Sequence, residues 1–335
     1  MRCLTSQLRT PVPNAYTIDV RLGPGDLERA LREDVRTGLS STPKRLSPKW
    51  HYDERGSALF SAITRLPEYY LTRCERSILV DHAPAIARAA GATTLIELGS
   101  GTSEKTRLLL DAMGGEGLLQ QFVPFDVDEG TLRGAAAAIA AAYPGVAVHA
   151  VVADFERHLD SLPPGGGRLV AFLGSTIGNL EPDARARFLA AVARALEPGD
   201  SLLLGTDLVK APERILPAYD DALGVTAAFS RNVLAVVNER LGANFAVAEF
   251  EHVPRWDAER ELVDIRVRTR IAQTVTVAGL GMRVELAAGE EILTEISAKF
   301  RRSGVEAELA GAGLELASWH TDPGGNFAVS LSTRP

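Results

Sequence analysis

A glycine loop follows the apolar segment at residues 95–98, in the sequence LIELGSGTSEKT. A phosphate-binding P-loop would need a glycine where this chain has Glu104, because backbone N–H groups must wrap the phosphates there. The dinucleotide fingerprint needs its third glycine at the same position, so Glu104 argues against both ligands. What remains is Glu97-x-Gly99-x-Gly101 at the end of a strand, where two glycines let the backbone approach a ligand without a pyrophosphate.

Two further carboxylates follow the next two apolar segments. Asp126 lies at the end of FVPFDV and suits the two hydroxyls of a ribose, as the acid of nucleotide-binding folds does. Asp154 follows VAVHAVV, and its carboxylate with the ring of Phe155 suits the amino group and the face of an adenine. Each feature alone is also explained as a turn, a helix cap or a core ring. Together, after successive strands, they favour a nucleoside without phosphates, such as S-adenosylmethionine.

The elements that position these residues are short β-branched runs, which alternate with Ala/Leu-rich helices over residues 93–207. This alternation predicts crossover connections and a parallel sheet whose strands end at one edge. The expected strands read TLIEL, FVPFDV, VAVHAVV, RLVAFLG and SLLLGTDL. Their continuous apolarity is typical of strands buried on both faces, so we predict an α/β fold with a doubly wound sheet.

Helix starts are expected where Ser or Thr precedes a helical pattern. The expected capping residues are Thr72 with Glu75, Thr102 or Ser103, and Ser303 with Glu306. The first pair would begin a helix over residues 73–90.

The chain divides into two patterns that predict two domains. Residues 72–209 and 300–335 are expected to form the core, since the tail ends in a hairpin of LELASWH and FAVSLST at the sheet edge. Residues 21–71 and 210–299 combine amphipathic helices with alternating strands and are expected to form a smaller α+β, substrate-binding lobe. Residues 1–20 match neither pattern and are interpreted as an N-terminal extension.

Composition limits the class of ligand. The 335 residues are 46% apolar, and the net charge is −7 with scattered basic residues, so we expect neither nucleic acid nor a membrane as a partner. Cys3 and Cys74 form no Cys-x-x-Cys pair, and the histidines show no ligand spacing, so we expect no metal site. No signal-like segment or membrane-length apolar run occurs. These observations predict a cytoplasmic protein that binds small molecules.

Longer stretches of the sequence resemble a known family. The stretches PKWHYDERGSALFSAITRLPEYYLTRCE, ELGSGTSEKTRLLLDA, FLGSTIGNL, GTDLVK and LTEISAKF are similar, in the same order, to the histidine N-alpha-methyltransferases of ergothioneine biosynthesis. The resemblance covers residues 25–330. It implies a class I methyltransferase fold, S-adenosylmethionine as the cofactor, and trimethylation of the α-amine of L-histidine to hercynine.

The resemblance also implies which residues form the site. Those implied for the methyl donor are Gly99, Lys105, Asp126, Asp154 and Phe155. Those implied for the substrate L-histidine are Tyr52, Tyr69, Asn179, Tyr219, Glu295 and Ser297. Of these, Tyr52 is expected to orient the amine, and Asn179 is expected to hold the α-carboxylate or the amine. Without the resemblance, Lys105 would be interpreted as an exposed helix lysine and Glu295 as a surface carboxylate near Lys299.

The chemistry of histidine gives these residues a separate physical basis. A neutral imidazole offers one donor and one acceptor nitrogen. Glu295 and Ser297 are two positions apart, so on an extended segment they share a face and can accept from one nitrogen and donate to the other. Methyl transfer to an amine mainly requires alignment, with reacting atoms about 3–3.5 Å apart. We therefore expect no strong base, because a phenol such as Tyr52 has a reference pKa of about 10.

Two residues leave alternatives open. Relatives commonly carry Met at the position of Ile265 and Phe at that of His51, and the branched Ile265 changes the shape of the pocket. A betaine-forming N-methyltransferase that acts on tryptophan or tyrosine is therefore the alternative enzyme. A non-catalytic protein that binds an amino acid or S-adenosylmethionine is the alternative from another class. We expect a monomer in each case.

Overall fold

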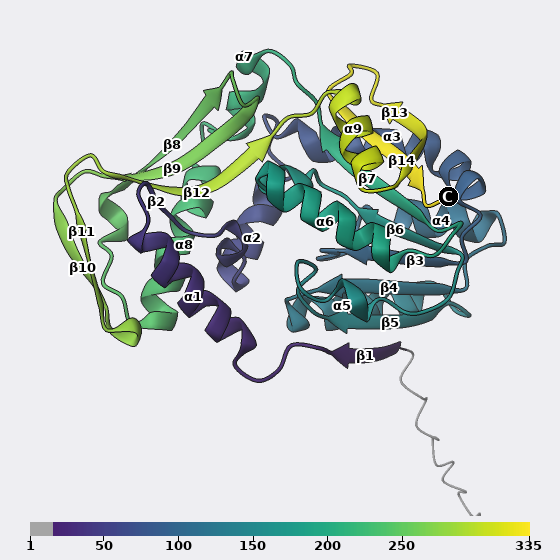
Figure 1. The fold of residues 1–335 in the computed structure, drawn as a ribbon, viewed down its shortest axis with the longest axis horizontal. Helices are drawn as coiled ribbons and strands as arrows, with labels where there is room; N and C mark the ends of the chain where they lie inside the picture. The colour runs from purple at the N-terminus through teal and green to yellow at the C-terminus, as the bar shows by residue number, and fades with distance from the viewer. Residues whose placement is uncertain (1–15) are drawn as a thin grey trace, which may run out of the picture.

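The central sheet contains eight strands in a computed structural model that describes residues 16–335. Its strand order is β1-β5-β4-β3-β6-β7-β14-β13 (Figure 1). The bounds are β1 Tyr16–Val20, β3 Thr94–Leu98, β4 Gln121–Asp126, β5 Ala147–Val152, β6 Arg168–Phe172, β7 Ser201–Asp207, β13 Glu315–Thr321 and β14 Phe327–Thr333. In this spatial order, neighbouring strands from β1 to β7 pair in parallel. In contrast, β14 pairs antiparallel with both β7 and β13. The predicted doubly wound α/β fold is confirmed.

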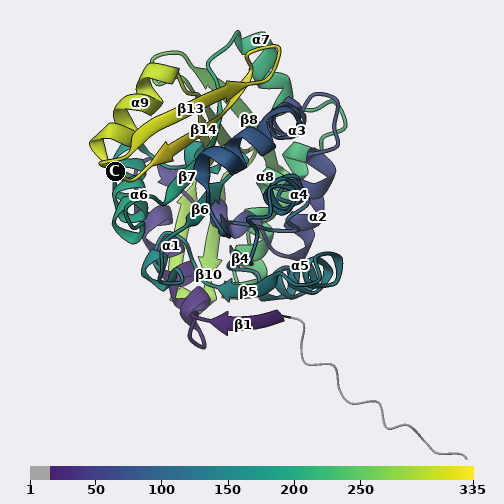
Figure 2. The same cartoon turned by 90° about the vertical axis from the view of Figure 1, so that its right-hand side faces the viewer.

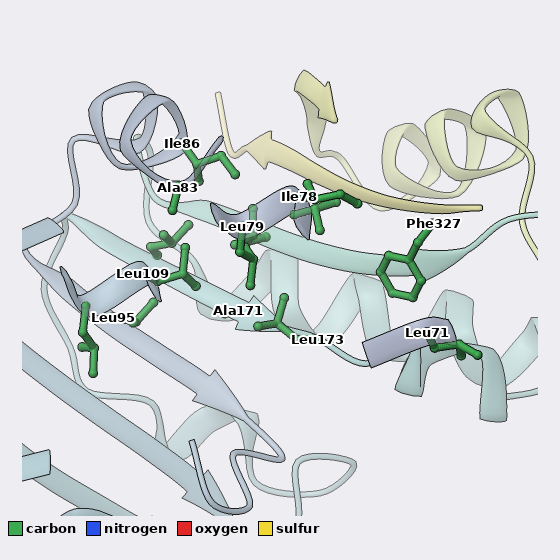
Figure 3. Close-up of a cluster of buried hydrophobic side chains, with 14 of the residues drawn as sticks. Leu71, Ile78, Leu79, Ala83, Ile86, Leu95, Leu109, Ala171, Leu173 and Phe327 are labelled. Carbon is green, nitrogen blue, oxygen red and sulfur yellow. The ribbon is translucent and has the colours of Figure 1, made fainter. Parts of the chain in front are cut away.

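Helices cover both faces of this sheet, because its strands are apolar on both sides. Figure 2 shows α3, α4 and α5 on one face and α6 with α9 on the other. The bounds are α3 Tyr70–Ala90, α4 Arg107–Gly115, α5 Glu129–Ala142, α6 Pro182–Ala195 and α9 Arg302–Gly311. On the first face, Ile78 and Leu79 of α3 pack with Leu95, Ala171 and Phe327 from the strands (Figure 3). This packing holds α3 against the strands of the central sheet, including β3, which precedes the glycine loop.

Both edges of the sheet come from the ends of the described chain. β1 pairs with β5, with Tyr16 opposite Val148, so a strand lies within the expected N-terminal extension. The expected C-terminal hairpin forms, and β14 pairs with β7 along its whole length. Cys3, together with the rest of that extension before residue 16, lies outside the described residues.

A second, four-stranded sheet has the order β2-β12-β9-β8 and lies beside the central sheet (Figure 1). Its strands are β2 Lys44–Arg45, β8 Phe250–Asp257, β9 Leu262–Thr269 and β12 Glu291–Ala298, with a hairpin of β10 Gln273–Val277 and β11 Met282–Leu286. The accompanying helices are α1 Asp26–Ser40, α2 Glu54–Ile63, α7 Pro212–Ile215 and α8 Val225–Leu241. Leu31 and Val35 of α1, Val233 of α8 and Val267 of β9 belong to a separate apolar core. The exact domain boundaries stay a prediction.

The chain segment at residues 208–299 leaves and re-enters the central sheet at one place. It leaves the central sheet after β7 and returns there at Phe300, whose backbone N–H donates to the Asp207 carbonyl at 2.8 Å. The Val209 N–H donates to the Phe300 carbonyl at 3.0 Å. Residues 208–299 therefore start and end side by side at the end of β7.

The expected helix caps are wrong. Helix α3 begins at Tyr70, so Thr72 lies inside it, and Glu75 is fully buried and binds groups outside the helix. Helix α4 begins at Arg107, after Thr102 and Ser103. Helix α9 begins at Arg302, where Glu306 pairs with Arg302 at 2.8 Å instead of capping with Ser303. For Glu75 and Glu306, a tertiary or side-chain contact replaces the local capping bond.

Candidate functional site

The glycine loop begins where β3 ends and folds over the end of β4. The Gly99 N–H donates to the Phe125 carbonyl at 2.8 Å, and Gly99 and Gly101 adopt φ values of 68° and 49°. These left-handed conformations favour glycine because a β-carbon adds strain there. A β-carbon on Gly99 would also lie 3.7 Å from the ring of Phe155. The loop therefore leaves an open backbone surface beside that ring.

Asp126 and Asp154 lie at the same edge of the sheet. Asp126 accepts hydrogen bonds from the Gly101 N–H at 2.9 Å and from the Asp128 N–H at 3.0 Å. One residue further along the strands, the Ala153 N–H donates to the Asp126 carbonyl at 2.9 Å, which places Asp154 next to it. The structure thus brings together the predicted ribose and adenine residues, and each Asp126 oxygen keeps a lone pair for a ligand hydroxyl.

Several polar atoms around the glycine loop are buried without a partner. Glu97 Oε2, Ser100 Oγ and Ser103 Oγ have no hydrogen-bond partner among the described residues. Burial raises the pKa of Glu97 to about 7, although Thr106 donates to its other oxygen. Buried polar groups are normally hydrogen-bonded, so these atoms fit a ligand that carries hydroxyls, an amine and a carboxylate. S-adenosylmethionine has all of these groups.

Lys105 lies at the other side of the loop, in an ion pair with Glu75. Its side chain is 25% exposed, whereas that of Glu75 is fully buried. The second Glu75 oxygen accepts from the Gly174 N–H at 2.7 Å, and a β-carbon on Gly174 would lie 3.7 Å from the Lys105 ammonium. Lys105 is therefore a fixed cation at the ends of β3 and β6, which contradicts the interpretation as an exposed helix lysine.

Tyr52 and Tyr69 line the space next to these residues within an aromatic cluster. Tyr52 packs edge-on against Phe60 and Phe229, with ring centroids 5.6 and 5.3 Å apart, and 39% of its surface stays open. Phe60 also packs against Tyr69 at 6.3 Å. Desolvation by these surroundings raises the pKa of Tyr52 well above its usual value, and the charges of Glu295 and Asp126 add to the shift. Tyr52 is thus affected by the charges of both predicted subsites: Asp126 belongs to the methyl-donor subsite, and Glu295 belongs to the substrate subsite.

Glu295 is a half-buried carboxylate on β12 that has no hydrogen-bond partner among residues 16–335. Burial raises its pKa to about 7, and the charge of Lys299 opposes that rise. The neighbouring Tyr69 and Tyr219 both feel its charge, which also raises their pKa values. An unpartnered carboxylate near two protonated phenols is a strong acceptor for a ligand N–H.

Ser297 follows two residues later on the same face of β12 and joins a buried polar cluster. Its hydroxyl lies 2.8 Å from the Tyr219 hydroxyl. Lys299 donates to both, at 2.7 Å to Ser297 Oγ and 2.6 Å to the Tyr219 oxygen. The ammonium also lies 3.0 Å from Asp207 Oδ2, and neither of these two side chains is exposed. Lys299 is therefore a buried cation of the site and not a surface lysine.

Asn179 is the last residue of a short 3-10 helix, Thr176–Asn179, that follows β6. Its side-chain amide has no hydrogen-bond partner within the described part of the chain. Together with Glu295 and with Ser47 and Pro48, it lines a cavity of about 320 Å³ between the two sheets. The structure therefore brings Asn179 to the same space as Glu295, although more than a hundred residues separate them.

His51 and Ile265, the two positions expected to differ from relatives, are both buried. His51 is fully buried and stacks on Phe229 at 4.8 Å, and burial lowers its pKa to about 4, so the ring is neutral. Ile265 is 1% exposed and pairs with Glu295 across the β9–β12 ladder. Ile265 therefore sets the position and shape of the wall behind the Glu295 carboxylate.

The comparison with known families decides the class of protein. Residues 31–334 match the model of a family described as histidine-specific methyltransferases that depend on S-adenosylmethionine. The chain belongs to this family. The predicted resemblance, methyltransferase activity and cofactor are thereby confirmed.

Members of this histidine-specific methyltransferase family with similar sequences are known from bacteria and fungi. The chain is 60% identical over 305 residues to a histidine N-alpha-methyltransferase of Mycolicibacterium smegmatis, covering 91% of this chain and 95% of that protein. It is 55% identical to the Mycobacterium tuberculosis protein with the same description, with the same coverage. It is 32% identical over 248 residues to ergothioneine biosynthesis protein 1 of Neurospora crassa, which covers 71% of this chain and 28% of that protein.

The sequence alone did not indicate that several charged residues of this methyltransferase belong to the site. Asp207, Glu75 and Lys299 are all buried next to predicted residues. Lys299 continues the two-residue spacing of Glu295 and Ser297, and this spacing is the signal that could have identified it. Within residues 16–335, the His, Cys, Asp and Glu side chains form no group of three or more that could hold a metal ion, and no helix has the length and apolarity to span a membrane.

Proposed function

We propose that this methyltransferase trimethylates the α-amino group of L-histidine to hercynine, a step of ergothioneine biosynthesis. The observation that carries the proposal is the pair formed by Glu295 and Ser297. An unpartnered carboxylate and a hydroxyl on one face of β12 match the N–H and the bare nitrogen of a neutral imidazole. The names of the bacterial relatives and of the fungal protein support the same reaction and pathway.

The methyl donor would be held by the glycine loop and the strand ends beside it. Gly99 leaves room for its backbone approach, Asp126 accepts from the ribose hydroxyls, and Asp154 with Phe155 contacts the adenine. Lys105 faces the carboxylate of the methionine part, since its ammonium is fixed at the loop. S-adenosylmethionine would supply a methyl group bound to a sulfonium, and the lone pair of the amine would attack the methyl carbon as the carbon–sulfur bond breaks and S-adenosylhomocysteine leaves.

The protein contributes mainly alignment to this displacement. Tyr52 and Tyr69 stay protonated at neutral pH because their pKa values are raised, so their phenols can donate hydrogen bonds but cannot serve as bases. The Asn179 amide has no hydrogen-bond partner among residues 16–335, so it can hold the α-carboxylate of the substrate. These contacts fix the amine near the donor, where reacting atoms about 3–3.5 Å apart replace lost translational entropy.

The proposed reaction is tested by incubating the purified protein with S-adenosylmethionine and histidine, tryptophan or tyrosine, each in a separate sample. Mass spectrometry should show histidine gaining one, two and three methyl groups. Methylation of only tryptophan or tyrosine would support the alternative betaine-forming enzyme. The branched shape of Ile265 would then be a candidate cause of the different substrate preference. Binding of both ligands without any methylation would support a non-catalytic binding protein. A monomeric state and a cytoplasmic location stay predictions.

A further inference from the structure

The ammonium group of Lys299 has three N–H bonds, and the buried cluster around it contains an acceptor for each of them. Two of them donate to the oxygens of Tyr219 and Ser297, at 2.6 and 2.7 Å. The third is left for Asp207, whose Oδ2 lies 3.0 Å away. An ammonium group is a donor only, so both hydroxyl oxygens must act as acceptors toward it.

The two hydroxyls also bond to each other at 2.8 Å, which uses one of their two protons. If Tyr219 donates, then Ser297 Oγ accepts from both Tyr219 and Lys299, and its lone pairs are filled. If Ser297 donates, the Tyr219 oxygen is filled in the same way. In either arrangement, one hydroxyl can offer a ligand only its proton.

We propose that Lys299 is a positioning residue that turns the Tyr219–Ser297 pair into a dedicated hydrogen-bond donor toward the substrate ring. This inference rests on the proposed function and adds a reason for its ring specificity. Glu295 would accept the imidazole N–H, and the pair would donate to the bare nitrogen. A ring that lacks the bare nitrogen would leave the donated proton without a partner, which should lower kcat/KM for that ring about tenfold or more.

The substitution Lys299→Met removes the ammonium and frees both hydroxyl oxygens to accept. The matched control is Lys210→Met, because Lys210 donates to the same Asp207 carboxylate at 2.6 Å but does not touch Ser297 or Tyr219. Lys299→Met combined with Asp207→Asn removes both buried charges at once. Lys299→Met leaves the buried Asp207 carboxylate without this cation, and the variant protein would not fold if that loss is too large. The double variant then still tests the proposal.

The measurement is kcat/KM for histidine divided by kcat/KM for analogues whose ring is a pyrrole, which keeps an N–H and replaces the bare nitrogen with C–H. Binding of S-adenosylhomocysteine, measured by calorimetry, shows that each variant retains the donor site. We expect this ratio to fall about tenfold or more in Lys299→Met, or in the double variant, and to stay unchanged in Lys210→Met.

An unchanged ratio in folded Lys299 variants would overturn the positioning role, as would an equal fall in Lys210→Met. A wild-type enzyme that methylates histidine and the pyrrole analogues equally well would overturn it too, while leaving the proposed function intact. A wild-type enzyme that does not methylate histidine would refute the proposed function and, with it, this inference.

Discussion

Glu75 and Lys105 form an ion pair that connects helix α3 to the glycine loop. The Glu75 side chain is fully buried, and it also accepts from the Gly174 N–H at 2.7 Å. A single carboxylate therefore links α3, the loop after β3 and the turn after β6. These are the segments that enclose the methyl donor in the proposed function.

The two members of this pair should differ in their effect on stability. Lys105→Met leaves a buried carboxylate uncompensated and should reduce the free energy of unfolding by about 3 kcal/mol or more. Glu75→Gln should cost less, about 1–2 kcal/mol, because its amide oxygen still accepts from Gly174 and the Lys105 ammonium reaches water. Urea denaturation of both variants measures the difference. A larger loss for Glu75→Gln would contradict the assigned burial of the pair.

Gly99→Ala should weaken donor binding as well as stability. Its φ of 68° makes a side chain strained, at a cost of about 1–2 kcal/mol, and the added carbon narrows the surface beside Phe155. Gly91→Ala is the matched control, because Gly91 has a φ of 57° at the end of α3 with no atom within 4 Å of the added carbon. Both variants should lose similar stability in denaturation experiments. Only Gly99→Ala should lose affinity for S-adenosylhomocysteine, so equal affinities would refute a donor role for this glycine.

Glu295→Gln should make the ligand-free enzyme more stable than the wild type at pH 8. The pKa of Glu295 is raised to about 7 in the folded protein, above its ordinary value of 4.5. The folded state therefore favours the neutral acid, and the wild type loses stability as pH rises through about 7, whereas the amide does not titrate. The free energy of unfolding of Glu295→Gln should exceed that of the wild type by about 1–3 kcal/mol at pH 8, and the difference should be close to zero near pH 4.5. A gain that does not depend on pH would show that Glu295 has an ordinary pKa.

Glu295→Ala separates the proposed substrate role from a structural one. The variant loses the acceptor for the imidazole N–H, so KM for histidine should rise at least about tenfold. Affinity for S-adenosylhomocysteine should stay within about twofold, because the donor site does not include this residue. Steady-state kinetics measure KM for histidine, and calorimetry measures the affinity for S-adenosylhomocysteine. Equal losses for the two ligands would indicate that Glu295 only supports the fold.

Asn179→Ala should impair catalysis without destabilising the protein. The Asn179 amide has no hydrogen-bond partner among the described residues, so its loss should change the free energy of unfolding by less than about 0.5 kcal/mol. Asn238 is the opposite case, since its amide bonds the Phe245 backbone at 2.8 and 2.9 Å. Asn238→Ala should therefore lower stability and leave kcat/KM for histidine unchanged. Steady-state kinetics that show the reverse order would refute a substrate role for Asn179.

The part of the fold that the sequence predicts well is the part that depends on local pattern. The buried strands at 94–98 and 201–207 are mostly apolar, and acidic or glycine residues follow where strands end at a shared edge. The C-terminal hairpin is also predictable, because alternating residues surround a turn. In contrast, the alternation of β1, YTIDV, covers only five residues, and its place beside β5 depends on pairing with residues more than a hundred positions away.

The charged groups of the site were harder to predict, because their roles depend on tertiary contacts. The pattern Thr72-x-x-Glu75 matches a helix cap, but the fold places Glu75 under Gly174 and next to Lys105. The sequence around Lys299 is compatible with a solvent-exposed lysine, but the fold buries its ammonium next to Asp207. Local propensity is a weak guide wherever a buried ion pair is available.

The closely spaced start and end of residues 208–299 have an evolutionary consequence. Because Asp207 and Phe300 are hydrogen-bonded neighbours, the backbone of this long segment leaves and re-enters the central sheet at a single point, and side chains such as Phe229 and Ile265 pack into the core beside that sheet. Changes in its length or sequence can be accommodated without altering the order of the strands that carry the donor loop. Such a plan lets one methylating scaffold diversify toward new acceptor amines by exchanging a module that contains Tyr219, Ile265 and Glu295.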